Sequence, residues 1–212
     1  FFLPTTHGTA SEVTMWGTLW NNKDKKKYSI SNRCLYPTAA ILDASLTLSL
    51  PYETSIITTL DALSHSFEAI WNKNATEKTN TYAIRAICLI LSNVEKLYNF
   101  PFDLNTRRKL LKSSMVSGLA FSNTATAAAH SISYPLTLYY DIPHGIASSI
   151  SLIPLLRINS KKIEKSLNQI YSILDIDGLE NLIDLIKKIP VSKLKYNLRD
   201  WGVKKNDLNW LV

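Results

Sequence analysis

The sequence predicts a mainly α-helical fold in which a short β-rich segment precedes the helices. From residue 51 onward, apolar side chains recur every three or four positions, which is the spacing of one face of a helix. Before residue 50, the chain instead holds short runs of β-branched and aromatic residues that turn residues separate. We therefore expect a domain boundary near Pro51, with residues 1–50 as one unit and residues 51–212 as a second, helical unit.

The first unit is expected to contain a β-hairpin. Residues 13–20 are rich in Val, Thr and Trp, and residues 28–31 could return antiparallel to them. Between these runs, residues 21–24 are typical of a turn. A further apolar run at residues 39–43 predicts a buried strand.

The second unit is expected to be a series of helices. Pro51 suits the first turn of a helix, and Glu53 places a negative charge near its positive end. The helical patterns cover residues 52–58, 61–72, 77–98, 104–118, 122–131, 145–155, 160–174, 178–188 and 205–212.

Composition narrows the class of protein. The chain has 212 residues, 46% of them hydrophobic, which is enough for one substantial core. Its net charge of +7 is compatible with nucleic acid, a membrane surface or an anionic small substrate. The basic residues are scattered apart from Lys25–Lys27, and no nucleic-acid-binding motif accompanies them. A nucleic-acid binder therefore stays only as an alternative.

The expected location is the cytoplasm. No apolar run reaches transmembrane length, no signal peptide is visible, and the two cysteines form no CxxC motif. The chain begins with Phe1 rather than Met, and both ends are apolar. We therefore expect a piece of a longer protein that acts on a small molecule and does not bind a membrane.

One expected helix carries an unusual polar stripe, formed by Asp61, His65, Glu68 and Asn72. Asp61 and His65 are four residues apart, so their side chains lie next to each other on a helix. A carboxylate and an imidazole this close could bind one divalent cation such as Fe(II), Zn, Ni or Mn. An exposed polar face or a simple Asp–His hydrogen bond explains the same pair.

Two other histidines stand in apolar, small-residue surroundings. His130 follows three alanines, and His144 lies between a proline and a glycine, where a helix can start. Buried polar groups cost free energy unless they are paired or bound to a ligand. If both histidines converge on Asp61 and His65, the site offers one oxygen and three nitrogens. Because no thiolate belongs to this set, a structural zinc site is not favoured.

Five segments resemble, in the same order, the motifs of iron-containing (group III) alcohol dehydrogenases. They are PTTHGTASEVT at residues 4–14, LD and LTLSLP within residues 42–51, DALSHSFEA at residues 61–69, AH at residues 129–130 and PHG at residues 143–145. The resemblance covers nearly the whole chain. It implies the C-terminal all-helical metal-binding domain of a dehydroquinate-synthase-like, iron-alcohol-dehydrogenase fold, preceded by a β-rich remnant of an α/β dinucleotide-binding domain.

The same resemblance implies a metal-dependent, NAD(P)-linked alcohol dehydrogenase that works chiefly as an aldehyde reductase. Asp61, His65, His130 and His144 fall on the four metal ligands of the family. The expected cofactors are Fe(2+), or Zn, Mn or Ni in its place, and NAD(P)H. The expected partners are a small aldehyde or alcohol and, because the family tends to form dimers, a second copy of the chain.

Other site residues follow from the resemblance alone. Thr5, Thr6 and Ser11 match positions that line the cofactor site, and Lys27 falls near a lysine that reaches the nicotinamide ribose. Tyr134 stands where the family often has a histidine assigned to proton relay, so it takes that role or leaves it to water.

Two further residues, His7 and Glu68, have two interpretations each. His7 and Ala10 replace the small residue and the glycine that are common in the family. Both positions lie by the cofactor in that family, whereas the alternative for His7 is a loop side chain that faces water. Glu68 either supports the metal ligands from behind or only stabilises its helix.

Within the family, residues 69–74, 119–124 and 131–136 look like the branch that reduces phosphonoacetaldehyde to 2-hydroxyethylphosphonate, an enzyme of phosphonate metabolism. The alternatives are a zinc glycerol-dehydrogenase-like enzyme or a dehydroquinate-synthase-like lyase of the same fold. A non-catalytic truncated fragment is a further alternative, because the family's glycine-rich phosphate-binding loop would precede Phe1.

Overall fold

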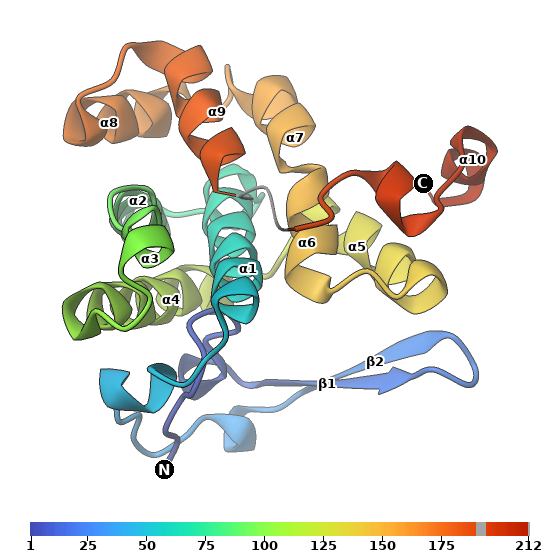
Figure 1. Ribbon diagram of the computed structural model, residues 1–212, viewed down its shortest axis with the longest axis horizontal. Helices are drawn as coiled ribbons and strands as arrows, with labels where there is room; N and C mark the ends of the chain where they lie inside the picture. The colour runs from blue at the N-terminus through green and yellow to red at the C-terminus, as the bar shows by residue number, and fades with distance from the viewer. Residues whose placement is uncertain (190–193, 212) are drawn as a thin grey trace.

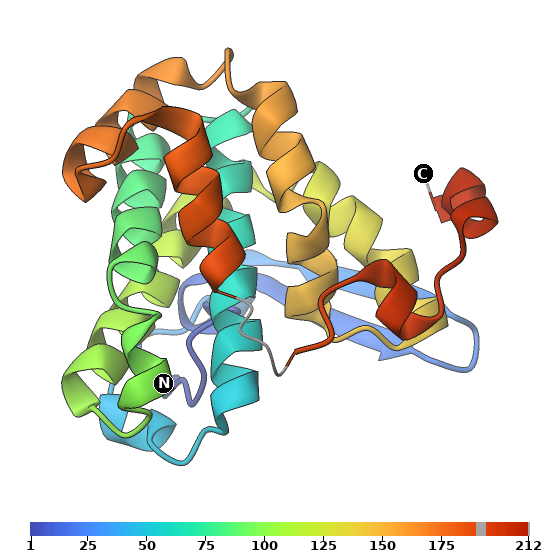
Figure 2. The same ribbon diagram turned by 45° about the horizontal axis from the view of Figure 1, so that its top comes forward.

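The computed structural model describes residues 1–189 and 194–211, and it is mainly helical (Figure 1). A single hairpin precedes the helices within these residues, formed by β1 (Trp16–Asn21) and β2 (Lys26–Ser31). The two strands pair antiparallel, with Trp16 opposite Ser31 and Asn21 opposite Lys26. The hairpin extends beside the helical body (Figures 1 and 2), and both the predicted fold class and the predicted hairpin are confirmed.

Helix α1 (Tyr52–Trp71) lies at the centre of the helical body. It packs against α2 (Glu77–Leu91), α4 (Leu104–Thr124) and α6 (His144–Ile150). Its side chains are almost all buried from Ser55 onward, because neighbouring helices cover it on several sides. The prediction of two helices here was wrong, since the chain turns continuously through residues 58–61.

The remaining helices surround this central group. They are α3 (Lys96–Asn99), α5 (Ala128–Tyr140), α7 (Leu152–Asn159), α8 (Glu164–Leu174), α9 (Gly178–Lys188) and α10 (Leu208–Leu211). Short 3-10 segments lie at Ser11–Val13, Arg33–Leu35, Ala44–Thr47, Leu198–Trp201 and Lys205–Asp207. In the part of the chain that the structure describes, no helix combines the length and the apolar composition needed to cross a membrane.

Several predicted boundaries differ from the observed ones. The helix predicted at residues 122–131 is wrong, because Ala125 adopts a positive φ of 64° that ends α4 before α5 begins. The helix predicted at residues 145–155 is divided between α6 and α7 at Ser151. The helix predicted at residues 77–98 is divided between α2 and α3 by a turn.

Agreement is mixed at the two ends of the chain. The predicted helix at residues 178–188 is confirmed, and α8 begins four residues later than predicted. The predicted strand at residues 39–43 is wrong, because this segment makes only an isolated bridge between Ala40 and Phe2. The predicted helix at residues 205–212 is reduced to a 3-10 turn and α10, and Val212 lies outside the described residues.

A buried polar network fixes the N-terminal loop to the helical body. Arg107 of α4 is only 1% exposed and donates hydrogen bonds to Ser55 Oγ at 2.6 Å, Pro101 O at 2.9 Å and Leu50 O at 3.1 Å. His7 lies against it, with its Nε2 3.5 Å from Arg107 Nη1. His7 is itself buried, so the alternative of a loop side chain that faces water is wrong.

The position of His7 predicts an acid-sensitive fold. Burial, and then the charge of Arg107, lower the pKa of His7 from 6.5 to about 4. At pH 5, His7 is therefore protonated in the unfolded chain and neutral in the folded chain. The free energy of unfolding consequently falls as the pH drops from about 6.5 toward about 4, by about 3 kcal/mol in total. We expect His7→Gln, which cannot titrate, to flatten this part of the stability profile.

Urea unfolding at pH 4.5, 5.5 and 7 would measure this effect as the difference between the wild-type and His7→Gln midpoints. The other titrating groups are common to both proteins, so they cancel in that difference. Parallel pH profiles for the two proteins would contradict the prediction.

Candidate metal centre

Helix α1 supplies two of the four predicted ligands. Asp61 and His65 are one turn apart on its buried face. Helix α6 can approach α1 closely because Gly145 has no side chain. A Cβ atom at this position would lie only 2.0 Å from Ile57 O. This close approach brings His144, the first residue of α6, to the same place.

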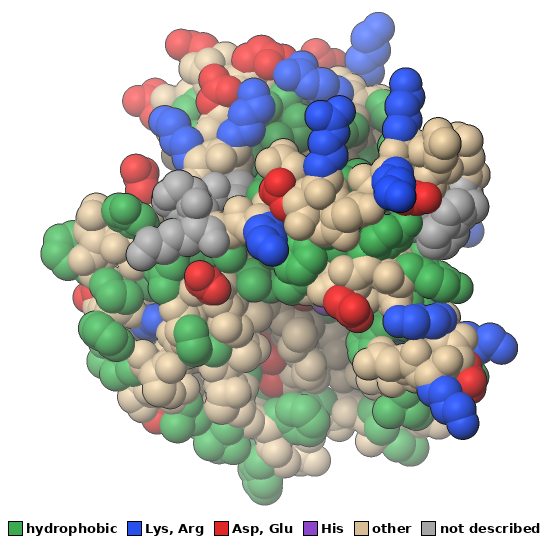
Figure 3. Space-filling view, turned by 45° about the vertical axis from the view of Figure 1, so that its right-hand side comes forward, with side chains coloured by type: hydrophobic (Ala, Val, Ile, Leu, Met, Phe, Trp, Pro, Cys, Tyr) green, Lys and Arg blue, Asp and Glu red, His purple; other side chains and the backbone are tan. Residues whose placement is uncertain are grey.

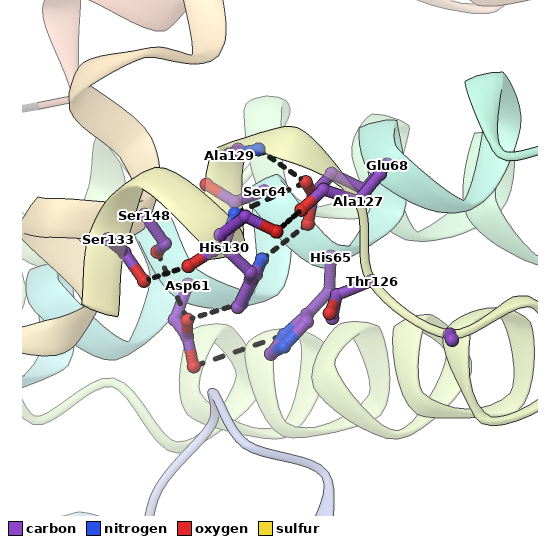
Figure 4. A network of polar contacts seen from close by, with 12 residues as sticks. Asp61, Ser64, His65, Glu68, Thr126, Ala127, Ala129, His130, Ser133 and Ser148 are labelled. Carbon is purple, nitrogen blue, oxygen red and sulfur yellow. Dashed lines mark hydrogen bonds and ion pairs between the residues drawn. The ribbon is translucent and has the colours of Figure 1, made fainter. Parts of the chain in front are cut away.

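The structure brings all four residues together, three of which are labelled in Figure 4. Asp61 Oδ2 lies 3.9 Å from His65 Nδ1. The other oxygen, Oδ1, lies 3.5 Å from His130 Nε2 and 3.8 Å from His144 Nε2. His130 reaches the site from the first turn of α5. Two of the four residues, His130 and His144, are distant from the α1 pair in sequence and adjacent to it in space.

This donor set fits a divalent cation. Ligand atoms bound at about 2.1 Å to one ion lie about 3–4 Å apart, which matches the spacing observed here. Within the described residues, His65 Nδ1 and His130 Nε2 are buried and have no hydrogen-bond partner. Such orphaned nitrogens are costly unless a ligand satisfies them. Ligand atoms of Asp61, His65 and His130 all lie within 4.8 Å of one another.

The charges of the site are divided unevenly. Burial works to raise the pKa of Asp61, but the three imidazoles together hold that pKa below its usual range, so the carboxylate is ionised. Burial lowers the pKa of His65 to about 3 and also lowers the pKa of His144. These two imidazoles are therefore neutral and offer lone pairs. His130 differs from these two residues. Burial lowers its pKa, but hydrogen bonds and charge from Asp61 and Glu68 raise the pKa to about 10, so this imidazole is protonated at neutral pH.

The four residues open onto a cavity of about 620 Å³ between the hairpin and the helices. Figure 3 shows a hollow near the middle of one face, with most Lys and Arg side chains of that view above it. Polar residues and aromatic rings share the lining of the cavity. It is lined by Phe2, Thr9, Ser11, Thr14, Trp16, Gly17, Thr18, Trp20, Lys27, Ser29, Ser31, Asp61, His65, Phe121, Ala125, Thr126, His130, Tyr134 and His144.

The predicted cofactor residues are only partly in this cavity. Ser11 and Lys27 line it, and Thr5 and Thr6 do not. Lys27 Nζ lies 3.7 Å from the centroid of the Tyr134 ring, a cation–π contact.

Tyr134 stands beside the metal-ligand set, with its ring stacked on His144 at 6.3 Å between centroids. The hairpin residue Trp20 packs edge-on against both rings. Local sequence contains no signal for this contact of Trp20, because the strand meets the helices only in the tertiary fold.

The sequence matches known families over almost its full length. Residues 55–212 match the Fe-containing alcohol dehydrogenase family, C-terminal, and residues 1–44 match iron-containing alcohol dehydrogenase. The chain belongs to the iron-containing alcohol dehydrogenase family. The family was therefore predicted correctly from the five motifs.

Relatives of known name support this membership. The chain is 31% identical over 197 residues to the probable alcohol dehydrogenase EutG of Escherichia coli (strain K12), covering 90% of this chain and 50% of EutG. It is 32% identical over 217 residues to 1,3-propanediol dehydrogenase of Citrobacter freundii, covering 98% of this chain and 56% of that enzyme. The chain thus spans about half the length of the curated relatives it matches.

Solved structures of this family share the fold. A 1,3-propanediol oxidoreductase superposes with a TM-score of 0.90 at 30% identity, covering 99% of this chain and 57% of that one. A sulfoacetaldehyde reductase from Bifidobacterium kashiwanohense, in complex with NAD+, superposes with a TM-score of 0.86 at 29% identity, covering 99% of this chain and 56% of that one. The iron-containing family supports a metal ion, and the NAD+ complex of this relative supports NAD as a cofactor.

Proposed function

We propose that this chain is the metal-binding part of an NAD(P)-linked alcohol dehydrogenase that works chiefly as an aldehyde reductase. In this proposal residues 51–212 form the helical metal-binding domain, and residues 1–50 are the remnant of the dinucleotide-binding domain. The convergence of Asp61, His65, His130 and His144 at the wall of one cavity carries the proposal. Fe(2+) is the ion that the family name favours, and Zn, Mn or Ni suits the same donors.

Each residue then has a defined task. When bound, the cation polarises a carbonyl oxygen of the substrate, and NAD(P)H supplies the hydride. Asp61 and the three imidazoles hold that cation at the cavity wall. Ser11 lines the cavity and would contact the cofactor there, whereas Thr5 and Thr6 lie outside the lining and would contribute only beyond it. The Tyr134 hydroxyl delivers the proton, directly or through water.

The substrate proposed is an aldehyde that carries an anionic group, with phosphonoacetaldehyde as the specific candidate. Among the described residues lining the cavity, Lys27 is the one Lys or Arg. Its ammonium lies over the Tyr134 ring at 3.7 Å, and its positive charge at the cavity wall would attract an anionic group of either the cofactor or the substrate. The similarity to a sulfoacetaldehyde reductase supports the same class of substrate.

We expect the full-length protein, purified without oxygen, to contain about one iron per chain and to oxidise NADH or NADPH with phosphonoacetaldehyde. Elemental analysis and an absorbance assay at 340 nm would measure the two properties. Sulfoacetaldehyde, propionaldehyde and glycerol form the comparison series.

Each result of that series has a distinct meaning. A preference for propionaldehyde over both anionic aldehydes would remove the substrate proposal and leave the enzyme class. A preference for glycerol oxidation would favour the glycerol-dehydrogenase-like alternative. Protein that holds no iron, zinc, manganese or nickel and lacks activity would overturn the proposed function.

A further inference from the structure

A second carboxylate, Glu68, lies directly behind the metal-ligand set. It is fully buried on α1, and its Oε1 accepts hydrogen bonds from the backbone N–H of Ala129 at 2.7 Å and of His130 at 3.2 Å. Its other oxygen, Oε2, contacts Nδ1 of the His130 ring (Figure 4). Glu68 therefore holds one residue, His130, by its backbone and by its side chain.

The backbone contacts replace a helix cap. The first N–H groups of a helix have no partner within the helix, and a side-chain oxygen usually satisfies one of them. Helix α5 begins after Ala127, which has no side chain that can do so. Glu68 supplies this oxygen from α1, and the start of α5 is thereby fixed to the helix that carries Asp61 and His65.

The side-chain contact determines which His130 nitrogen faces the site. Glu68 already accepts two backbone N–H groups, and a carboxylate oxygen accepts hydrogen bonds, so Nδ1 is the donor toward Glu68. Nε2, which has no hydrogen-bond partner among the described residues, lies on the side of Asp61 Oδ1. Because His130 is protonated at neutral pH in the absence of a cation, a cation has to displace the proton on Nε2. When Nδ1 keeps its proton toward Glu68, Nε2 is the nitrogen that then offers a lone pair.

We propose that Glu68 is a positioning residue that sets both the place and the tautomer of His130 for cation binding. This inference rests on the proposed function, because it assumes that the four residues bind a cation. It assigns Glu68 more than the stabilisation of a helix, which was the simpler interpretation of the polar stripe on α1.

The variant Glu68→Gln separates positioning from simple capping. The amide oxygen of glutamine can still accept the N–H groups of Ala129 and His130, so the cap is retained. Its NH2 group then faces Nδ1, which has to become an acceptor. The ring proton moves to Nε2, where it blocks the lone pair that the cation needs.

Zn²⁺ is a suitable probe, and competition with a chelating dye measures its affinity for the full-length protein. We expect Glu68→Gln to bind Zn²⁺ about 10–100-fold more weakly than the wild type. The matched control is Glu12→Gln, which also neutralises a buried carboxylate, one that lies outside the cavity lining. We expect its Zn²⁺ affinity to match the wild type.

A measurement on the wild type keeps the test independent of whether Glu68→Gln folds. Nitrogen-15 NMR of the Zn²⁺-loaded protein should show His130 with a proton on Nδ1 and none on Nε2. Wild-type affinity in Glu68→Gln, or the opposite tautomer in the wild type, would overturn this inference and leave the proposed function in place. A wild-type protein that binds no Zn²⁺ would overturn both.

Discussion

Replacing His144 by alanine in the full-length protein is expected to lower aldehyde reduction about a thousandfold or more. A bound cation contributes several kcal/mol of transition-state stabilisation, and each 1.4 kcal/mol changes a rate about tenfold. His144 Nε2 lies 3.8 Å from Asp61 Oδ1, so the variant removes one of the four proposed ligands. The iron content should fall together with the rate.

The fold should survive this substitution. The side chain of His144 is 32% exposed to the cavity, so its removal leaves no sealed void in the core. Far-UV circular dichroism and the thermal midpoint would check this point, and His7→Gln assayed at neutral pH is the matched control, because His7 is the histidine outside the site. Full activity in an iron-free His144→Ala protein would refute the ligand assignment.

The local patterns of the sequence predict much of this fold. The hairpin follows from β-branched and aromatic residues around a turn, and helix α9 follows from apolar residues at helical spacing. The break at Ala125 could not be predicted, because a positive φ is unusual for alanine and the groups that contact this segment are distant in sequence: Asn72 and Asn74 donate hydrogen bonds to the carbonyl oxygens of residues 124–126. The single helix α1 was divided in error, since its β-branched Thr58 and Thr59 are poor helix formers that bond to Ser55 O.

The candidate site was predictable to a different depth. The spacing of Asp61 and His65 on one helix predicts that their side chains are adjacent. His130 and His144 reach them only through the tertiary fold, and the resemblance to the family assigned them to the same site. Glu68 carried a signal, because it continues the polar stripe, but its target His130 lies 62 residues away.

The burial of His7 could not be predicted from sequence, because it depends on a distant partner. Arg107 is 100 residues further along the chain, and no periodic pattern connects the two residues. A basic residue on a helix is normally assumed to face solvent. Here the guanidinium is satisfied by carbonyl oxygens and a hydroxyl instead.

The substitution Arg107→Met is expected to destabilise the folded protein by about 3 kcal/mol. Methionine fills much of the same volume but donates no hydrogen bond, so Leu50 O and Pro101 O lose their partner and Ser55 Oγ loses a donor. An unpaired buried acceptor costs about 1–3 kcal/mol, and relief of the buried charge offsets part of that cost.

The neighbouring Arg108 is exposed and serves as the matched control, for which a change within about 0.5 kcal/mol is expected. Urea unfolding at pH 7 would measure both variants, and equal midpoints for Arg107→Met and Arg108→Met would contradict the prediction.

The hydrogen bonds of Arg107 and the acid sensitivity caused by His7 are linked, because the two side chains are in contact. Because burial and then the charge of Arg107 lower the pKa of His7, removing that charge should let His7 titrate nearer its ordinary value. Arg107→Met should therefore lose less stability than the wild type when the pH falls from 6.5 to 4.5, although it is less stable at pH 7.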